Sequence, residues 1–451
     1  MKILIVSNLY PPYYGGGYEV RCAQVAEALQ HSGHDVCVLT STYGLPASAL
    51  GNTRPRCEER NGVPVHRALN HYLHKPQPVQ LPGRLFAVKR HLWDAQQFQQ
   101  LVKSFQPDIV NWWGMYSLSK TLLPLPHAWG IPDVHWIEHW WMIREYGPAG
   151  EIAAALWSDC WDGNWGPRIC RPLFRWGGRR WERRFDQEDV PTRSFPNRPS
   201  HVCFVSEYLR TLYRDEGFDF PSSEVIYGGV PTALFYAPIH GLRDAPKPLR
   251  CLYAGQISPD RGLHTVIEAI GHMDFGHRSR LRLSIAGHST SAYFTDIKAR
   301  VAALGLTETV AFLGQIPHEQ MPGLYKQHHV LVFPSTREEG LPLTMIEAML
   351  SGCAVVTTGS GGAMEVATLA DLPVFPKNNS AALSHLITQL VTHREQVPEI
   401  ASRGQKIALQ EFSLDRMMRR FGETLDRIYT DHATRVAGRS QQVKEGIYVN
   451  E

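Results

Sequence analysis

Residues 330–349 read VLVFPSTREEGLPLTMIEAM. The apolar run Val330–Phe333 is typical of a strand buried on both faces of a parallel sheet. A glycine-containing loop follows at Ser335–Pro342, and a helix is expected to begin near Leu343. In open α/β sheets, ligands bind at the carboxyl ends of parallel strands. This strand–loop–helix junction is therefore the first candidate for a functional site.

Two acids lie on this junction, Glu339 in the loop and Glu347 one turn into the helix. Free backbone N–H groups at a helix start suit a phosphate. The Glu347 carboxylate could accept hydrogen bonds from ribose hydroxyls, and Glu339 could reach a sugar. Each acid alone also fits a plainer role, as a solvated loop acid or a helix-capping acid. Their combination at the end of a parallel strand favours a nucleotide-sugar site.

Short apolar runs alternate with helical patterns along the chain. Ile3–Val6, a helical segment closed by Gly33, and Val36–Leu39 form a strand–helix–strand unit. Further strands are expected at 108–110, 202–205, 225–226, 251–253, 281–286, 310–313 and 354–356, and helices at 263–270, 291–304 and 343–351. The sequence therefore predicts two doubly wound, Rossmann-like α/β domains.

Composition suggests the domain boundaries. The first domain is expected at 1–237, with a Trp- and Arg-rich insertion at about 140–195. A Pro-rich linker is expected at 238–248, and the second domain at 249–411. An amphipathic helix is expected at 412–432, followed by a polar tail at 433–451.

Composition and charge are those of an ordinary globular protein. Hydrophobic residues make up 43% and charged residues 20% of the 451 residues, and the net charge of +3 is too small to indicate a nucleic-acid-binding protein. The eight cysteines include no CxxC pair, which is typical of a reduced, cytoplasmic protein. The apolar run Ile3–Val6 is too short for a signal peptide or a membrane span. We expect a cytoplasmic protein, either soluble or attached to the inner face of the membrane.

Aromatic and basic residues are concentrated in the insertion. All twelve tryptophans lie between Trp93 and Trp181, and the segment Trp165–Phe185 contains seven arginines and one glutamate. This segment fits a helical insertion whose arginine stems cover an apolar surface. It also fits a patch that contacts a membrane surface or an anionic acceptor. Nucleic-acid binding is disfavoured because no recognised motif accompanies the charge.

Glu339 and Glu347 reproduce a Glu-x7-Glu signature, and the chain resembles the family-4 retaining glycosyltransferases of GT-B fold, also described as glycosyl transferases group 1. The resemblance implies two Rossmann-like domains facing across a cleft, with a helix near 412–432 crossing back to the first domain. It implies transfer of a hexosyl group from a nucleotide-diphosphate sugar to a glycan, lipid-linked or small-molecule acceptor, without a metal cofactor. In that family the first acid lies near the donor sugar and the second binds the donor ribose. A role in polysaccharide biosynthesis is the expected context.

Other motifs extend the resemblance along most of the chain. Tyr10–Glu19 resembles the glycine loop that approaches the donor phosphates and the acceptor, and Gly255–Gly262 resembles the phosphate clamp written G-R-L-x-x-x-K-G. Gly314–Pro317 resembles the loop that holds the base through backbone groups. Val225–Val230, with the later Phe235, resembles the segment that closes the family's first domain, and Gly359–Glu365 resembles the glycine turn and acid after the last predicted strand. The donor-binding residues implied are Gly16, Gly17, Gly255, Gln256, Arg261, Gly314, Ile316, Glu339, Gly340, Leu341, Pro342, Leu343, Thr344 and Glu347.

Some positions depart from the family's pattern. Arg261 stands where lysine is usual and can bind phosphate in a bidentate manner. Gln256 stands where arginine is usual, so one of two cations that would neutralise the departing diphosphate is missing. The stretch Glu138–His139 replaces a His-Asp pair, which makes His139 the first and Glu138 the second candidate on the acceptor side. Asn111 stands where a family histidine is common.

The sequence also permits three interpretations other than a transferase. The segment His135–His139 fits the zinc-peptidase pattern H-x-x-E-H. Its flanks favour a strand, on which the two histidines would lie too far apart to share one ion. A non-catalytic sugar-nucleotide-binding homologue and a sugar-nucleotide epimerase on the same fold stay open as alternatives. For the transferase, the predicted catalytic residues are Glu339, Arg261 and His139, with no metal site.

Overall fold

The computed structural model describes most of the chain. The described residues are 1–45, 56–71, 81–145, 198–239 and 248–447, with a few positions between 151 and 196. Within these ranges, the side chains of 81–88, 144–145 and 439–447 are not described. Nearly all of the predicted patch Trp165–Phe185 lies outside the described residues, and so does most of the insertion at about 140–195.

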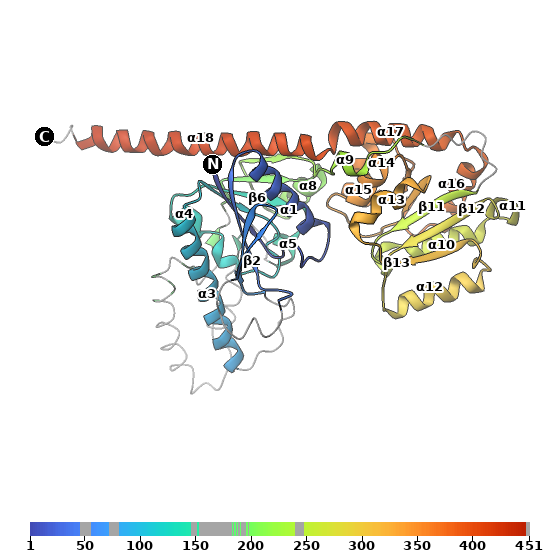
Figure 1. Ribbon diagram of the computed structural model, residues 1–451, viewed down its shortest axis with the longest axis horizontal. Helices are drawn as coiled ribbons and strands as arrows, with labels where there is room; N and C mark the ends of the chain where they lie inside the picture. The colour runs from blue at the N-terminus through green and yellow to red at the C-terminus, as the bar shows by residue number, and fades with distance from the viewer. Residues whose placement is uncertain are drawn as a thin grey trace. The chain divides into compact units, whose positions relative to one another are not determined.

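The chain divides into two compact units, each with its own sheet, in which all or most neighbouring strands run parallel (Figure 1). Unit 1 comprises Met1–Phe204, Arg210–Val225 and Met418–Glu451, and unit 2 comprises Val205–Leu209 and Ile226–Met417. The prediction of two α/β domains is confirmed.

The division between the units differs from the predicted linker at 238–248. Residues 226–237, which were predicted as the end of the first domain, belong to unit 2. Phe235 is buried in the core of unit 2, and its carbonyl oxygen accepts a hydrogen bond from the Ser351 hydroxyl at 2.9 Å. Proline content alone therefore does not report how the residues before the predicted linker pack. Residues 240–247 lie outside the described residues.

Unit 1 contains an eight-stranded sheet in the order β10-β9-β6-β5-β1-β2-β4-β3. The strands are β1 (Lys2–Ser7), β2 (Asp35–Ser41), β3 (Arg56–Arg60), β4 (Val63–Leu69), β5 (Ile109–Trp112), β6 (Asp133–Ile137), β9 (His201–Phe204) and β10 (Ser223–Val225). Neighbouring strands run parallel, except for the antiparallel edge pair β3–β4. The predicted run Ile3–Val6 is completely buried in the middle of this sheet, as expected for a strand covered on both faces. A separate antiparallel pair is formed by β7 (Glu151–Ile152) and β8 (Phe195–Pro196).

The helices of unit 1 connect these strands. They are α1 (Gly17–His31), α3 (Leu81–Phe105), the 3-10 turn η1 (Lys120–Leu122), α4 (Leu125–Ala128), α5 (Trp141–Glu145), α8 (Glu207–Asp215) and α18 (Leu414–Ile447). Helices α8 and α18 each begin in unit 2 and continue in unit 1. The helix predicted before Gly33 is α1, and Gly33 follows its end with a φ of +87°.

Unit 2 contains a five-stranded parallel sheet in the order β13-β12-β11-β14-β15. Its strands are β11 (Leu249–Ala254), β12 (Leu281–Ala286), β13 (Val310–Gly314), β14 (Val330–Phe333) and β15 (Ala354–Thr357). Its helices are α9 (Thr232–Phe235), η3 (Pro259–Arg261), α10 (Leu263–His272), α11 (Phe275–Arg278), α12 (Ala292–Ala303), η4 (His318–Gln320), α13 (Met321–Lys326), α14 (Leu343–Leu350), α15 (Gly362–Ala370), α16 (Ser380–Thr392) and α17 (Gln396–Glu411). The predicted strands and helices of this half are confirmed to within a few residues.

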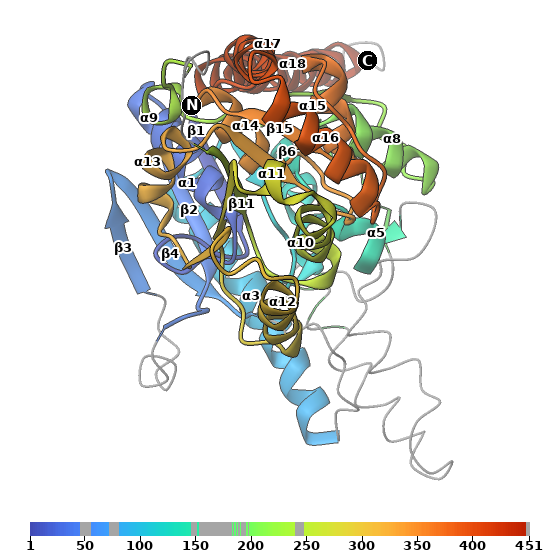
Figure 2. The same ribbon diagram turned by 90° about the vertical axis from the view of Figure 1, so that its right-hand side faces the viewer.

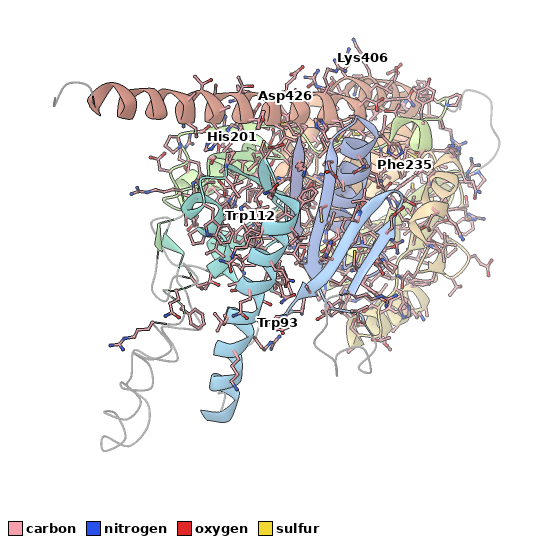
Figure 3. The ribbon with its side chains drawn as sticks, turned by 60° about the vertical axis from the view of Figure 1, so that its left-hand side comes forward. Trp93, Trp112, His201, Phe235, Lys406 and Asp426 are labelled. Carbon is pink, nitrogen blue, oxygen red and sulfur yellow. The ribbon has the colours of Figure 1, made fainter. Side chains whose placement is uncertain are left out.

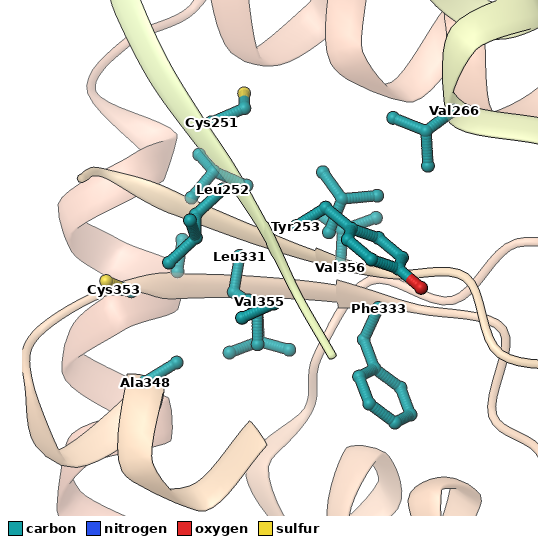
Figure 4. Close-up of a cluster of buried hydrophobic side chains, with 14 of the residues drawn as sticks. Cys251, Leu252, Tyr253, Val266, Leu331, Phe333, Ala348, Cys353, Val355 and Val356 are labelled. Carbon is teal, nitrogen blue, oxygen red and sulfur yellow. The ribbon is translucent and has the colours of Figure 1, made fainter. Parts of the chain in front are cut away.

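Helices cover both faces of the unit 2 sheet. Helices α10 and α12 lie on one side of β11 and its neighbours, and α14 and α17 lie on the other (Figures 1 and 2). Figure 4 shows the core between them, where Leu252, Leu331 and Val355 from three adjacent strands lie between Val266 of α10 and Ala348 of α14. Burial on both faces explains why these strands are continuous apolar runs instead of alternating patterns.

Helix α18 is longer than predicted. It continues to Ile447, past the expected end at 432 and through most of the segment predicted as a polar tail. No proline interrupts residues 414–447, and most residues there are good helix formers. The polar composition of residues 433–447 is therefore compatible with a continuous helix.

A cluster of polar side chains fixes α18 to the sheet of unit 1. The carboxylate of Glu224, in β10, accepts hydrogen bonds from Thr424 Oγ1 at 2.8 Å, Arg420 Nη2 at 3.1 Å and Arg427 Nη2 at 2.6 Å. His201 Nε2 of β9 lies 3.1 Å from Glu224 Oε1. Figure 3 labels His201 on the sheet and Asp426 on the helix. The hydrogen bonds with His201 and Thr424, together with the charge of Arg427, lower the pKa of Glu224 to about 2.

Replacing Glu224 by Gln should destabilise unit 1 by about 1–2 kcal/mol at neutral pH, because the bonds to charged partners are lost. The pKa of Glu224 is lower in the folded than in the unfolded chain, so its contribution exists above about pH 4 and disappears as the pH falls toward 2. Chemical unfolding at a series of pH values should show the two proteins converging in acid. Glu423→Gln, at an exposed position of the same helix, is the control and should match the wild type. A constant difference at every pH would contradict this account.

Candidate functional site

The five strands of unit 2 run parallel, so their carboxyl ends lie at one edge of the sheet. The loops at that edge carry the sequence motifs singled out above. Gly255–Gly262 follows β11, and Ser335–Pro342 follows β14. Gly314–Pro317 begins with the last residue of β13 and continues into the loop after it. Gly359–Glu365 follows β15. The predicted donor-binding residues of this half therefore gather at a single edge.

The loops after β11 and β14 are in direct contact. The Asp260 carbonyl oxygen accepts hydrogen bonds from the backbone N–H groups of Thr336 at 2.9 Å and Arg337 at 3.1 Å. Gly262 lies against the same loop: a Cβ added there would lie 2.1 Å from the Pro334 carbonyl oxygen, and its φ is +69°. Only glycine fits this position without a shift of one loop. The contact fixes the two motifs relative to each other.

Arg261 and Glu339, one from each of these loops, form an ion pair through Arg261 Nη1 and Glu339 Oε1. Ser335 Oγ donates a second hydrogen bond to Glu339 Oε1 at 3.0 Å. Burial raises the pKa of the Glu339 carboxyl, and the charge of Arg261 opposes that rise. Both side chains keep some exposure, 22% for Arg261 and 16% for Glu339, so a ligand can reach the pair. A cation and a carboxylate held together this way suit a phosphate beside a sugar.

The backbone around Glu339 is held by the loop after β15. The Gly362 N–H donates to the Glu339 carbonyl oxygen at 2.6 Å, and a Cβ at Gly362 would lie 2.0 Å from the Gly340 carbonyl oxygen. Ser206 Oγ donates to that same Gly340 oxygen at 2.7 Å. The sequence motif of glycines after β15 thus has a structural reason, since it lets the backbone approach the Glu339 loop closely.

Glu347 lies on α14, which begins at Leu343 after Pro342. Its side chain is 9% exposed, and both carboxylate oxygens have partners. Tyr325 Oη donates to Oε2 at 2.9 Å, and His318 Nε2 lies 3.1 Å from Oε1. The hydrogen bond to Glu347 raises the pKa of His318. Sequence reasoning missed His318 and Tyr325, although His318 directly follows the predicted base loop.

The remaining predicted donor-binding residues of unit 2 lie in the loops after β11 and β13 and in the first turn of α14. Gln256 is exposed, and its carbonyl oxygen accepts a hydrogen bond from Tyr253 Oη at 2.7 Å. Gly314 has a φ of +74°, and Ile316 packs against the apolar core of unit 2. Because the Ile316 side chain faces the core, this loop can offer its backbone groups to a ligand. Leu343 and Thr344 form the first turn of α14, where helix N–H groups lack partners within the helix.

Unit 1 places a second set of predicted residues at the carboxyl edge of its own sheet. Gly16 and Gly17 are exposed at the start of α1, and the Gly16 N–H donates to Glu19 Oε2 at 3.0 Å. His139 follows β6 and is half-buried. Its ring lies edge-on to those of Tyr18 and Tyr116, with centroids 5.5 Å and 6.1 Å away. Of the predicted acceptor-side residues, His139 is the one whose ring lies at this edge.

The other two acceptor-side candidates have structural partners. Glu138 Oε1 accepts hydrogen bonds from Arg21 Nη1 and Trp136 Nε1, both at 2.8 Å. Burial raises the pKa of Glu138, and Arg21 opposes that rise. Asn111 is completely buried in β5; its amide donates to the Val134 carbonyl oxygen at 3.0 Å and accepts from Trp113 Nε1 at 2.6 Å. The structure therefore places Asn111 inside the sheet and not among residues that can meet an acceptor.

The two histidines of the H-x-x-E-H segment have different partners. His135 lies in β6, as the sequence predicted, and its Nε2 lies 3.1 Å from Asp133 Oδ2. His127 Nε2 lies 3.0 Å from the other oxygen of Asp133. Burial works against ionisation of Asp133, but the bonds from His127 and His135 hold its pKa well below the usual range. Within the described ranges, no group of three His, Cys, Asp or Glu side chains could hold a metal ion.

Membrane contact was predicted for Trp165–Phe185, which lies almost entirely outside the described residues. In the part of the chain that the structure describes, no helix is long and apolar enough to cross a membrane.

Two family models match the chain. The model described as Glycosyltransferase Family 4 matches residues 15–234, and the model described as Glycosyl transferases group 1 matches residues 241–407. An uncharacterized glycosyltransferase of Methanocaldococcus jannaschii is 24% identical over 397 residues, which cover 84% of this chain and 86% of that protein. Glycogen synthase of Mycobacterium tuberculosis is 25% identical over 376 residues, covering 80% of this chain and 79% of that enzyme.

Solved structures share the fold at low sequence identity. Sucrose-phosphate synthase from Thermosynechococcus elongatus has a TM-score of 0.66 at 17% identity, covering 95% of this chain and 99% of that chain. Anabaena HepE in complex with UDP-glucose has a TM-score of 0.62 at 18% identity, covering 95% of this chain and 100% of that chain. These similarities show that the fold is the GT-B fold.

Proposed function

The chain belongs to the group 1, family-4 glycosyltransferases, and on that premise we propose that it transfers a hexosyl group from a nucleotide-diphosphate sugar with retention of anomeric configuration. The observation that carries the proposal is the ion pair of Arg261 and Glu339 at the same sheet edge as Glu347. Arg261 would bind the diphosphate, Glu339 the sugar and Glu347 the ribose. The complexes of HepE with UDP and UDP-glucose support testing a uridine donor first.

The proposed transfer depends on charge that develops as the bond between the anomeric carbon and the phosphate oxygen breaks. The sugar becomes positive and the departing diphosphate negative. Arg261 and the N–H groups at the start of α14 would stabilise the diphosphate, and such preorganised donors lower the barrier. The acceptor oxygen forms the new bond on the same face, and its proton passes to the departing phosphate oxygen. Glu339 would orient the sugar and stabilise its positive charge.

Metal independence is part of the proposal. In this mechanism a guanidinium and helix N–H groups neutralise the diphosphate, which is the role that a divalent cation has in other transferases. Activity should therefore survive treatment with a chelator. The acceptor is proposed to be a glycan or a lipid-linked sugar that reaches His139. If the acceptor is lipid-linked, the proposal includes binding of the protein to anionic membranes through Trp165–Phe185. Binding to anionic vesicles is the corresponding measurement.

Gln256 favours one alternative, a homologue that binds nucleotide sugars without transferring them. Gln256 is exposed in the loop that carries Arg261, and it offers no charge to a diphosphate. Such a protein would bind the donor and release no nucleotide from it. An acceptor-independent assay, which measures UDP released when water replaces the acceptor, separates the two functions.

Glu347→Gln should weaken donor binding about tenfold to a hundredfold, since hydrogen bonds to a charged group contribute about 1–3 kcal/mol. Calorimetric titration of UDP-, GDP- and ADP-glucose without added metal identifies the donor, and the variant is then titrated with the sugar nucleotide that binds. Glu338→Gln, which removes an exposed carboxylate of the loop after β14, is the control. Equal affinity of the Glu347 variant and the wild type would remove Glu347 from the donor site.

A further inference from the structure

The described structure shows Glu347 with its carboxylate already occupied. Carboxylate oxygens only accept hydrogen bonds, so His318 Nε2, 3.1 Å from Oε1, carries the proton that joins the two side chains. Tyr325 Oη donates to the other oxygen at 2.9 Å. Glu347 is 7% exposed as a residue. A buried carboxylate without partners is costly, so these two bonds stabilise it when no ligand is present.

The two partners of Glu347 differ in their freedom to move. Tyr325 is buried on α13 and packs near Phe235, with ring centroids 6.2 Å apart. His318 lies on the short 3-10 turn η4, and its side chain is 34% exposed. Its ring packs at a tilt of 56° to that of Phe235, with centroids 5.7 Å apart. His318 can therefore rotate away from Glu347 at low cost, whereas Tyr325 cannot.

We propose that His318 is a positioning residue of the donor site: it holds Glu347 Oε1 in the empty enzyme, and a donor ribose hydroxyl replaces it there. This inference rests on the proposed function, because it takes Glu347 to be the ribose ligand. Tyr325 keeps its bond to Oε2 in both states and fixes the direction of the carboxylate. The ribose hydroxyl supplies the hydrogen bond that His318 gives up, so Glu347 is never left without a donor.

The exchange makes donor binding depend on pH. The groups that face His318 are Glu347 of α14, Tyr325 of α13 and Glu319 of its own turn, while Phe235 of α9 carries no charge. The bond to Glu347, assisted by its charge and that of Glu319, raises the pKa of His318. Protonated His318 binds Glu347 more strongly than neutral His318 does. Donor affinity should therefore fall as the pH decreases through the raised pKa of His318.

The test is calorimetric titration of the 451-residue protein with UDP-glucose, and with GDP- and ADP-glucose, from about pH 5.5 to about pH 8.5. The diphosphate of these sugar nucleotides is esterified at both ends, so the ligand does not itself titrate in this range. For the wild type, we expect affinity to fall by up to about tenfold for each pH unit below the pKa of His318. His318→Ala should bind at least as tightly as the wild type at high pH, and its affinity should stay constant with pH. His318→Gln keeps a neutral donor for Glu347 and should also remove the pH dependence.

The control is His277→Gln, which replaces a histidine on α11 that pairs with Asp274 at the opposite edge of the sheet. It should keep the pH dependence of the wild type. Weaker binding by His318→Ala at every pH would show that His318 contacts the donor, and would overturn the inference. The same pH dependence in His318→Ala and the wild type would also overturn it, while leaving the proposed function intact. No binding of any of the three sugar nucleotides to the wild type at any pH would instead overturn the proposed donor site, and this inference with it.

Discussion

Glu339→Gln should lower the turnover number by roughly a hundred- to a thousandfold, the loss seen when one preorganised electrostatic group is removed from a transition state. The substitution keeps the size of the side chain and can keep the bond from Ser335 Oγ, 3.0 Å away in the wild type. It removes the negative charge that would stabilise the sugar as its bond to the diphosphate breaks. Donor affinity should change much less, because Glu347 and Arg261 carry most of the binding in the proposed site.

The measurement for Glu339 is release of UDP from UDP-glucose with and without an acceptor mixture, compared with the dissociation constant from titration. The adjacent Glu338 is the matched control, since it is an exposed acid that pairs with Lys377 at 2.8 Å on the surface. Glu338→Gln should keep the turnover of the wild type. If Glu339→Gln and Glu338→Gln had equal turnover, Glu339 would have no role in the chemistry. If Glu339→Gln lost binding instead of turnover, Glu339 would be a donor ligand only.

The fold was predictable because most strands of both units are buried on both faces. The continuous runs Ile3–Val6 and Val330–Phe333 are completely or nearly completely buried, and no exposed position interrupts their apolar pattern. Two features of the chain's organisation were not predictable from composition. Residues 226–239 belong to unit 2, where Phe235 packs in the hydrophobic core. Helix α18 continues to Ile447, past its predicted end. The first outcome depends on the packing partners of Phe235, and the second depends on helix propensity summed over many residues. Neither can be inferred from a proline-rich or polar stretch of sequence.

The candidate site was predictable where its residues lie close together in the sequence or at the ends of strands of one parallel sheet. Glu339 and Glu347 lie on one loop and the following helix, and the parallel sheet brings Arg261 beside Glu339 from another loop. Prediction failed where a side chain's partner is far away in sequence. His318 lies 29 residues before its partner Glu347. Asn111 donates to the Val134 carbonyl oxygen because β6 pairs with β5 in the sheet, and the sequence alone does not report that pairing. Glu138, likewise, meets Arg21 across 117 residues.

Gly262→Ala should destabilise unit 2 and also weaken donor binding, because Gly262 sets the distance between the two loops that hold Arg261 and Glu339. The added methyl group would lie 2.1 Å from the Pro334 carbonyl oxygen, at a φ of +69° that alanine adopts with strain. Gly305→Ala is a close control, since Gly305 has a φ of +64° and no atom within 4 Å of its added Cβ. The control should lose only the strain energy of the backbone, about 1–2 kcal/mol.

The difference between these two variants isolates the close contact of the loops. Gly262→Ala should lose about 1–3 kcal/mol more than Gly305→Ala in chemical unfolding, the usual cost of forcing an atom into a packed region. Any relief of the contact must move the Pro334 backbone or the turn at Pro259–Arg261, and either shift separates Arg261 from Glu339. Titration with UDP-glucose should then show reduced affinity for Gly262→Ala and wild-type affinity for Gly305→Ala. Equal stability and equal affinity of the two variants would mean that the loops can separate without affecting the site, and that their contact does not position Arg261.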